Sequence, residues 1–211
     1  SFTMSGGTIV LQRVNIQTFP DYINLAATNN VTGGTLQIGN ASTAAGQNFR
    51  INSTAPIFNL VLDATTQTKS AQLLTNSLVV KNNIDIQGGT LNANNLNFTV
   101  GGNWNNNGSF TAGTGLVTFN GIAGQAISGN NVTTFNRITL DNLAGLTLNR
   151  NVNISGTTNA LTFTNGKITT GGFTLFLSNT GAAVTNAGAG KYVFGFLQKA
   201  FSNTALSKTF E

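Results

Sequence analysis

The feature that most constrains this chain is a short alternating apolar pattern that returns at intervals of roughly 20 residues. Each group alternates apolar residues with one polar or outward-facing residue, which is typical of a short, half-buried β-strand. Clusters of asparagine, glycine and threonine separate the groups, and no segment has the apolar spacing of a helix. The clearest groups are residues 60–62, 78–80, 98–100, 117–119, 138–140, 161–163, 175–177 and 192–194.

A longer period lies over the short one. Residues 89–100 align without a gap to residues 166–177, which begin 77 residues later. Repeated units of several short strands are typical of a solenoid, because one unit cannot bury its apolar face alone and successive units must stack. We expect residues 1–195 to form this repeat region and residues 196–211 to leave it towards a following domain.

Both periods predict an all-β chain that folds as a parallel β-helix of roughly ten short coils, with strands paired along the axis at about 4.8 Å. Asparagine suits the corners, because it tolerates the left-handed backbone conformation and its amide can bond the backbone or an asparagine of the next coil. The alternative is an antiparallel β-sandwich. Three hairpin signals favour it: Asn107-Gly108, Asn120-Gly121 and Asn165-Gly166.

The composition excludes several kinds of site. The chain has no histidine and no cysteine, so it holds neither a Ser-His-Asp triad nor a zinc site of the Cys/His type. The net charge of +5 comes from 10 basic and 5 acidic residues, with no basic cluster, so we expect no nucleic-acid partner. No apolar run reaches the length of a transmembrane helix, and we expect no direct membrane insertion and no cofactor.

The candidate site residues are few. The carboxylates available for catalysis or metal binding are Asp21, Asp63, Asp85, Asp141 and Glu211. We expect Asp63 and Asp141 to lie several coils apart, too far to act on one sugar, and the aspartates to make hydrogen bonds at strand ends. The sequence therefore predicts no catalytic residues and no metal site. Trp104 and Tyr192 are the candidate ligand-binding residues, since aromatic rings stack on sugars, with corner packing as the alternative for Trp104.

Two stretches resemble a known family. Residues 100–121, and residues 125–129 followed by 135–140, are similar to the repeats of very long surface proteins from Bacteroidetes-type bacteria. Residues 192–201 and 208–211 look like the segment that leaves the solenoid in that family. The resemblance covers about residues 33–211. It implies a right-handed coil and a secreted, adhesin-like protein of the cell surface, exported by type IX secretion.

These observations together predict a non-catalytic structural stalk or passenger segment of a secreted bacterial cell-surface protein, not an enzyme. The expected partners are further repeats or domains of the same polypeptide, surface glycans or other cell-surface proteins. Two alternatives stay open: a β-helix module that binds or degrades polysaccharide, and a subunit of a self-assembling extracellular filament.

Overall fold

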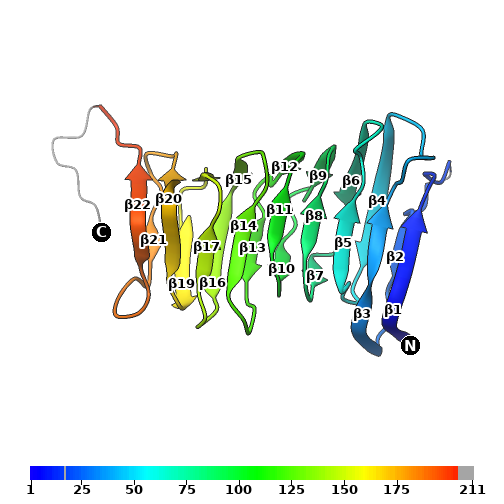
Figure 1. Cartoon of the computed structure of the whole chain (residues 1–211), viewed down its shortest axis with the longest axis horizontal. Coiled ribbons are helices and arrows are strands. Elements are labelled where there is room, and N and C mark those ends of the chain that lie inside the picture. Colours follow the sequence, from blue (N-terminus) through cyan, green and yellow to red (C-terminus); the bar gives the residue numbers. More distant parts are fainter. Residues whose placement is uncertain (17, 204–211) are drawn as a thin grey trace.

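The computed structural model describes residues 1–16 and 18–203, and within them the chain forms 22 β-strands and no helix. The strands stack into an elongated β-solenoid of about eight turns, with the first strand, β1, and the last strand, β22, at opposite ends of the rod (Figure 1). The prediction of a parallel β-helix is confirmed. The predicted number of roughly ten coils is too high, and the hand of the coil stays a prediction.

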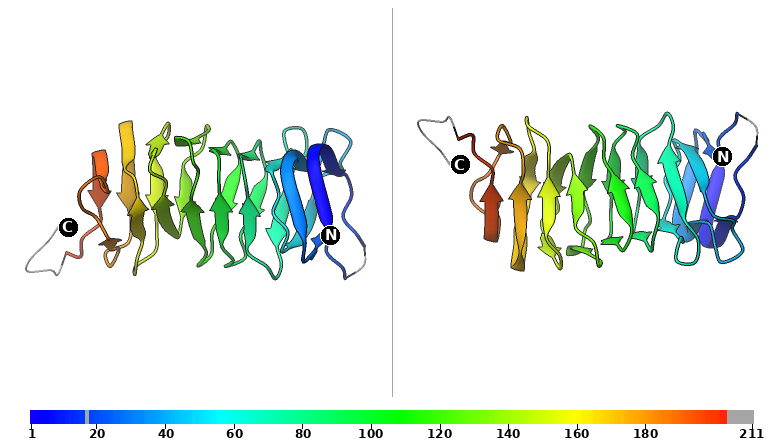
Figure 2. Two further views of the ribbon diagram at one scale, coloured as in Figure 1. Left: turned by 90° about the horizontal axis from the view of Figure 1, so that it is seen from below. Right: turned by 90° about the horizontal axis from the view of Figure 1, so that it is seen from above.

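The coil has three faces, and Figure 2 shows the rod from below and from above, with the strands side by side along its axis. Face A contains β1 (Phe2–Leu11), β3 (Asn29–Ile38), β5 (Asn59–Leu62), β8 (Ile84–Ile86), β11 (Trp104–Asn106), β14 (Gln125–Ser128), β17 (Leu146–Leu148) and the first halves of β20 (Ile168–Leu177) and β22 (Val193–Lys199). Face B contains β2 (Tyr22–Asn24), β4 (Gln47–Ser53), β6 (Lys69–Leu73), β9 (Thr90–Asn92), β12 (Ser109–Thr111), β15 (Thr133–Phe135), β18 (Val152–Ile154) and the second halves of β20 and β22. Face C contains β7 (Leu78–Val80), β10 (Phe98–Val100), β13 (Leu116–Phe119), β16 (Arg137–Asp141), β19 (Leu161–Asn165) and β21 (Val184–Thr185).

Every pair of neighbouring strands is parallel, which rules out the antiparallel sandwich. Paired residues are separated by one coil: Phe98 pairs with Val117, and Leu60 pairs with Ile84. At the first coil the separation is longer, since Ser5 pairs with Gly33. These longer coils explain why the chain forms fewer turns than a uniform spacing of roughly 20 residues predicts.

The apolar residues of the short strands point into the coil, and the residue between them points out. In β8 and β10, for example, the first and last residues are buried and the central residue is partly exposed. One part of the core is aromatic. The ring of Trp104 lies 4.7 Å from that of Phe110 and 5.1 Å from that of Phe135, in edge-on arrangements that aromatic pairs favour.

Asparagine side chains link the coils at the corners, as predicted. The Oδ1 atom of Asn83 accepts the backbone N–H of Asn103 at 2.8 Å, and Oδ1 of Asn103 accepts the N–H of Ala126 at 2.8 Å. Four other asparagines have positive φ, namely Asn94, Asn95, Asn159 and Asn186. Both properties for which asparagine was expected at corners are therefore used.

The three hairpin signals occupy corners of the coil instead of hairpins. At Gly166, which has a φ of +80°, an added Cβ would lie 1.8 Å from the carbonyl oxygen of Asn142 in the preceding coil. At Gly108 it would lie 2.5 Å from the oxygen of Gly89. Glycine is needed at these positions because neighbouring coils approach closely, and the same residue types that favour a tight hairpin therefore also favour a solenoid corner.

The solenoid continues past the boundary expected after Gly195. Strand β22 runs to Lys199, and its second half pairs with Leu175 and Leu177 of β20. The expected exit segment therefore begins inside the last strand, and its residues 204–211, with Glu211, lie outside the described residues. The segments matched by the 77-residue repeat lie on different faces: residues 90–92 are on face B, whereas Ile168 is on face A.

Candidate functional site

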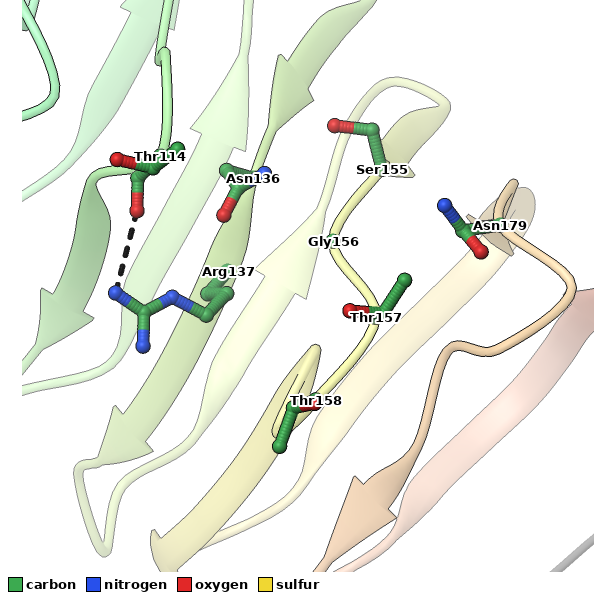
Figure 3. Close-up of a pocket in the computed structure, with 8 residues that line it drawn as sticks. All are labelled: Thr114, Asn136, Arg137, Ser155, Gly156, Thr157, Thr158 and Asn179. Carbon is green, nitrogen blue, oxygen red and sulfur yellow. Dashed lines mark hydrogen bonds between the residues drawn. The ribbon is translucent and has the colours of Figure 1, made fainter.

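A depression lined by polar residues lies at the corner between faces B and C, and we call it the Arg137 pocket (Figure 3). It encloses about 490 Å³. Four successive coils contribute to it, through the loop before β13, the start of β16, the loop after β18 and the loop after β20. Its lining residues are Thr114, Asn136, Arg137, Ser155, Gly156, Thr157, Thr158 and Asn179.

A close approach of two coils forms the middle of this pocket. The backbone N–H of Gly156 donates to the carbonyl oxygen of Asn136 at 2.8 Å. An added Cβ at Gly156 would lie 2.5 Å from that oxygen, so the position accommodates only glycine. Because this residue has no side chain, the surface stays hollow between Arg137 on one side and Thr157 and Asn179 on the other (Figure 3).

Arg137 is the only charged residue that lines the pocket. Its Nη2 atom donates to the carbonyl oxygen of Thr114 at 3.2 Å, and this is the single hydrogen bond of its guanidinium within the described residues. A guanidinium carries five N–H donors, so most of its donors face the pocket or solvent. No carboxylate lines the pocket, and it therefore has no pair of groups for acid–base chemistry.

The predicted ligand-binding residues are not brought together. Trp104 is fully buried at 0 % exposure on face A, packed against three phenylalanines, so its ring is not accessible to a ligand at the surface. Trp104 is the first residue of β11, directly after the corner between faces C and A, and its ring packs into the core. Tyr192 is 41 % exposed and precedes β22, near the far end of the rod. The two rings cannot contact the same ligand.

The aspartates make separate hydrogen bonds; Asp63 and Asp141 lie at strand ends, as expected, whereas Asp85 is the central residue of β8. Asp85 accepts bonds from the amides of Gln87 and Asn105 at 2.8 and 2.7 Å. Asp141 accepts a bond from Asn165 at 2.7 Å on face C, whereas Asp63 lies just after β5 of face A and accepts a bond from Thr65 at 2.9 Å. Across the described part of the chain, no group of three or more acidic, histidine or cysteine residues is placed to hold a metal ion.

Two features escaped the sequence-based predictions. One is the Arg137 pocket itself. The other is a column of five threonines stacked on the outside of face C, in which each residue pairs with the next along the axis: Thr99, Thr118, Thr139, Thr162 and Thr185. The signal for most of this column is present in the sequence, because the first four of these threonines are each the central residue of an alternating apolar group.

An apolar depression lies at the corner between faces C and A. Ile122 is fully exposed and Leu143 is 85 % exposed, and both line one hollow of about 370 Å³ together with Asp141. Asp141 is the only charged residue there. Among the described residues there is no helix of the length and apolar character that would let it span a membrane.

Comparison of this chain with protein families, with curated proteins and with solved structures found no match.

Proposed function

We propose that this chain is a non-catalytic structural segment, a stalk or passenger, of a secreted bacterial cell-surface protein. The observation that carries the proposal is the continuity of the coil: parallel ladders run along all three faces, and side chains at the corners bond the backbone of the next coil. About eight turns at about 4.8 Å each give a rod of about 40 Å, which holds whatever is attached at its ends at a fixed separation.

The surface location and type IX export rest on the sequence resemblance described above. Adhesin-like proteins of that family present binding parts away from the cell, and a stiff, sparsely charged spacer suits that role. Of the alternatives, degradation of polysaccharide is the less favoured, since Asp63 and Asp141 lie on different faces and Asp85 bonds two amides.

Two measurements test this proposal. Single-molecule stretching of the chain between two folded handles should show resistance followed by extension in steps of one or a few coils, because each coil is bonded mainly to its neighbours. A chain that extends without resistance would contradict the structural role. Release of reducing sugar from a panel of polysaccharides, abolished by Asp63→Ala or Asp141→Ala, would show that the segment is an enzyme instead.

A further inference from the structure

The Arg137 pocket has the donors of a binding site and few internal acceptors for them. Beyond the bond from Arg137 to Thr114, the side chains of Asn136, Thr157 and Thr158 make no hydrogen bonds within the described residues. Asn179 uses its Oδ1 to accept the N–H of Gly181 at 3.0 Å, which leaves its Nδ2 hydrogens directed to solvent or to a ligand.

The charge of the pocket selects for an anion. Arg137 contributes a permanent positive charge, and the lining has no aspartate or glutamate to neutralise it. Arginine binds a carboxylate through two parallel N–H···O bonds, which is the strongest recognition that a single side chain offers to that group. The charge is therefore available to a ligand and is not consumed by an internal ion pair.

The rest of the lining selects for hydroxyl groups over apolar surface. Thr157 and Thr158 contribute hydroxyls, and Asn136 and Asn179 contribute amides. The hydroxyl of Ser155 donates to the carbonyl oxygen of Phe135 at 3.3 Å, which leaves only its acceptor capacity for a ligand. Hydroxyls and amides each donate and accept, so they match the hydroxyls of a sugar ring, while no large apolar side chain lines the pocket to hold a lipid or an apolar peptide.

We propose that the Arg137 pocket binds an acidic saccharide, with the carboxylate of a hexuronate residue on the guanidinium of Arg137. In this arrangement the acid lies near Thr114, toward which the guanidinium extends, and the hydroxyls of the sugar residues that follow lie over Asn136, Thr157 and Asn179 (Figure 3). The pocket crosses four coils, so a saccharide longer than one residue extends along the rod axis. The binding site goes beyond the structural role proposed above and does not depend on it.

The test is titration calorimetry of the whole chain with a galacturonate tetrasaccharide, a neutral tetrasaccharide of the same length and inorganic phosphate. Salt is kept low in one series and at physiological strength in a second, because screening weakens exposed charge interactions. We expect the galacturonate to bind in both series, and the neutral sugar and phosphate to bind at least about tenfold more weakly, since each lacks one half of the recognition.

Three variants assign the binding to this pocket. Arg137→Gln should weaken galacturonate binding by at least about tenfold, and Arg137→Lys by less, since it keeps the charge and loses the paired bonds. Arg150→Gln is the matched control, because it removes the same charge as Arg137→Gln. Arg150 is half-buried like Arg137, and it does not line the Arg137 pocket or the hollow beside Ile122. This control should change the affinity by less than about twofold. Thermal melting confirms that each variant is folded.

Several outcomes would overturn the proposal. No galacturonate binding to the unaltered chain would do so, and so would an equal loss of affinity in Arg137→Gln and Arg150→Gln, which would indicate attraction to the net charge alone. Phosphate that binds as tightly as the saccharide would show a simple anion site without sugar recognition. None of these outcomes bears on the stretching measurement, so the structural role is tested separately.

Discussion

Two corners of the coil bury a long polar side chain, and they treat it in opposite ways. At the corner between faces C and A, Gln125 is 3 % exposed and makes four hydrogen bonds. At the corner between faces A and B, Lys69 is 1 % exposed, and its Nζ atom has no hydrogen-bond partner in the described part of the chain. The two side chains are similarly buried, but the Gln125 amide has four hydrogen bonds and the Lys69 ammonium has none.

The partners of Gln125 explain why it is stable there. Its Oε1 accepts the N–H of Gly121 at 2.8 Å and the amide of Asn142 at 3.0 Å. Its Nε2 donates to the carbonyl oxygens of Val100 and Gly102 at 2.9 and 2.5 Å. One side chain therefore links its own loop to the coils before and after it, and every polar atom of its amide is satisfied.

Lys69 has only its stem to stabilise it. The stem packs against Gly39, where an added Cβ would lie 2.6 Å from Cδ of Lys69. A buried ammonium without a partner loses its hydration and gains no bond in return, which costs several kcal/mol. The comparison shows that the polar interior of this solenoid is stabilising only where each group finds acceptors and donors in the adjoining coils.

The largest effect is expected where the network is broken. Gln125→Leu keeps a side chain of similar size but leaves the Gly121 N–H and the Gly102 carbonyl without a partner. The Val100 carbonyl keeps the N–H of Asn120, and the Asn142 amide keeps the carbonyl of Ala123. Each unpaired buried group costs about 1–3 kcal/mol, so the free energy of unfolding should fall by roughly 3 kcal/mol or more. Urea unfolding followed by circular dichroism measures it.

Gln72→Leu is the matched control for this change. Gln72 lies on the outward side of β6 and is only partly buried, so the same replacement should alter the free energy of unfolding by less than about 0.5 kcal/mol. Equal losses in the two variants would mean that the bonds of Gln125 contribute nothing beyond the loss of a glutamine.

Removal of the unpaired ammonium of Lys69 should raise the free energy of unfolding, whereas loss of the Gln125 amide should lower it. Lys69→Met keeps the stem against Gly39 and removes the charge, and we expect the free energy of unfolding to rise by about 2 kcal/mol. Lys81→Met is the comparison, because Nζ of Lys81 donates to the carbonyl oxygen of Val31 at 2.8 Å, and its loss should cost about 1 kcal/mol. The same unfolding assay serves both, and a less stable Lys69→Met chain would contradict the account.

Much of this fold could be predicted from the sequence, because its cause is local and repeated. Alternation in groups such as residues 98–100 and 138–140 sets which side chains point inward, and the interval between groups sets the coil. The same rule places Trp104 inside, since Asn103 and Asn105 on either side point outward. The predicted number of roughly ten coils is too high, because the alternating strand pattern does not determine the length of the corner loops.

The candidate site could not be predicted in the same way. Thr114, Arg137, Thr157 and Asn179 come from four coils, and their meeting depends on the length of every loop between them. The 77-residue repeat does not predict which residues meet at a corner, because segments that align in sequence lie on different faces of the coil. Alternation within one strand is enough to predict which side chains are interior. A surface pocket depends on how the corner loops of successive coils line up, and the strands do not determine this.

The smallest effect is expected at an exposed bond between coils, where water competes for the same groups. Asn103→Ala removes the bond from the N–H of Ala126 to Oδ1 of Asn103 and should lower the free energy of unfolding by about 1 kcal/mol. Asn83 and Asn103 form a column in which each asparagine accepts the backbone N–H of the next coil, and this column ends at Ala126. Ala126 pairs with Thr147 of the next coil. Ala126→Asn extends the column by one step and should raise the same quantity by about 0.5 kcal/mol. Because the two substitutions act on one column in opposite directions, urea unfolding that moved both variants the same way would show that the column does not link the coils.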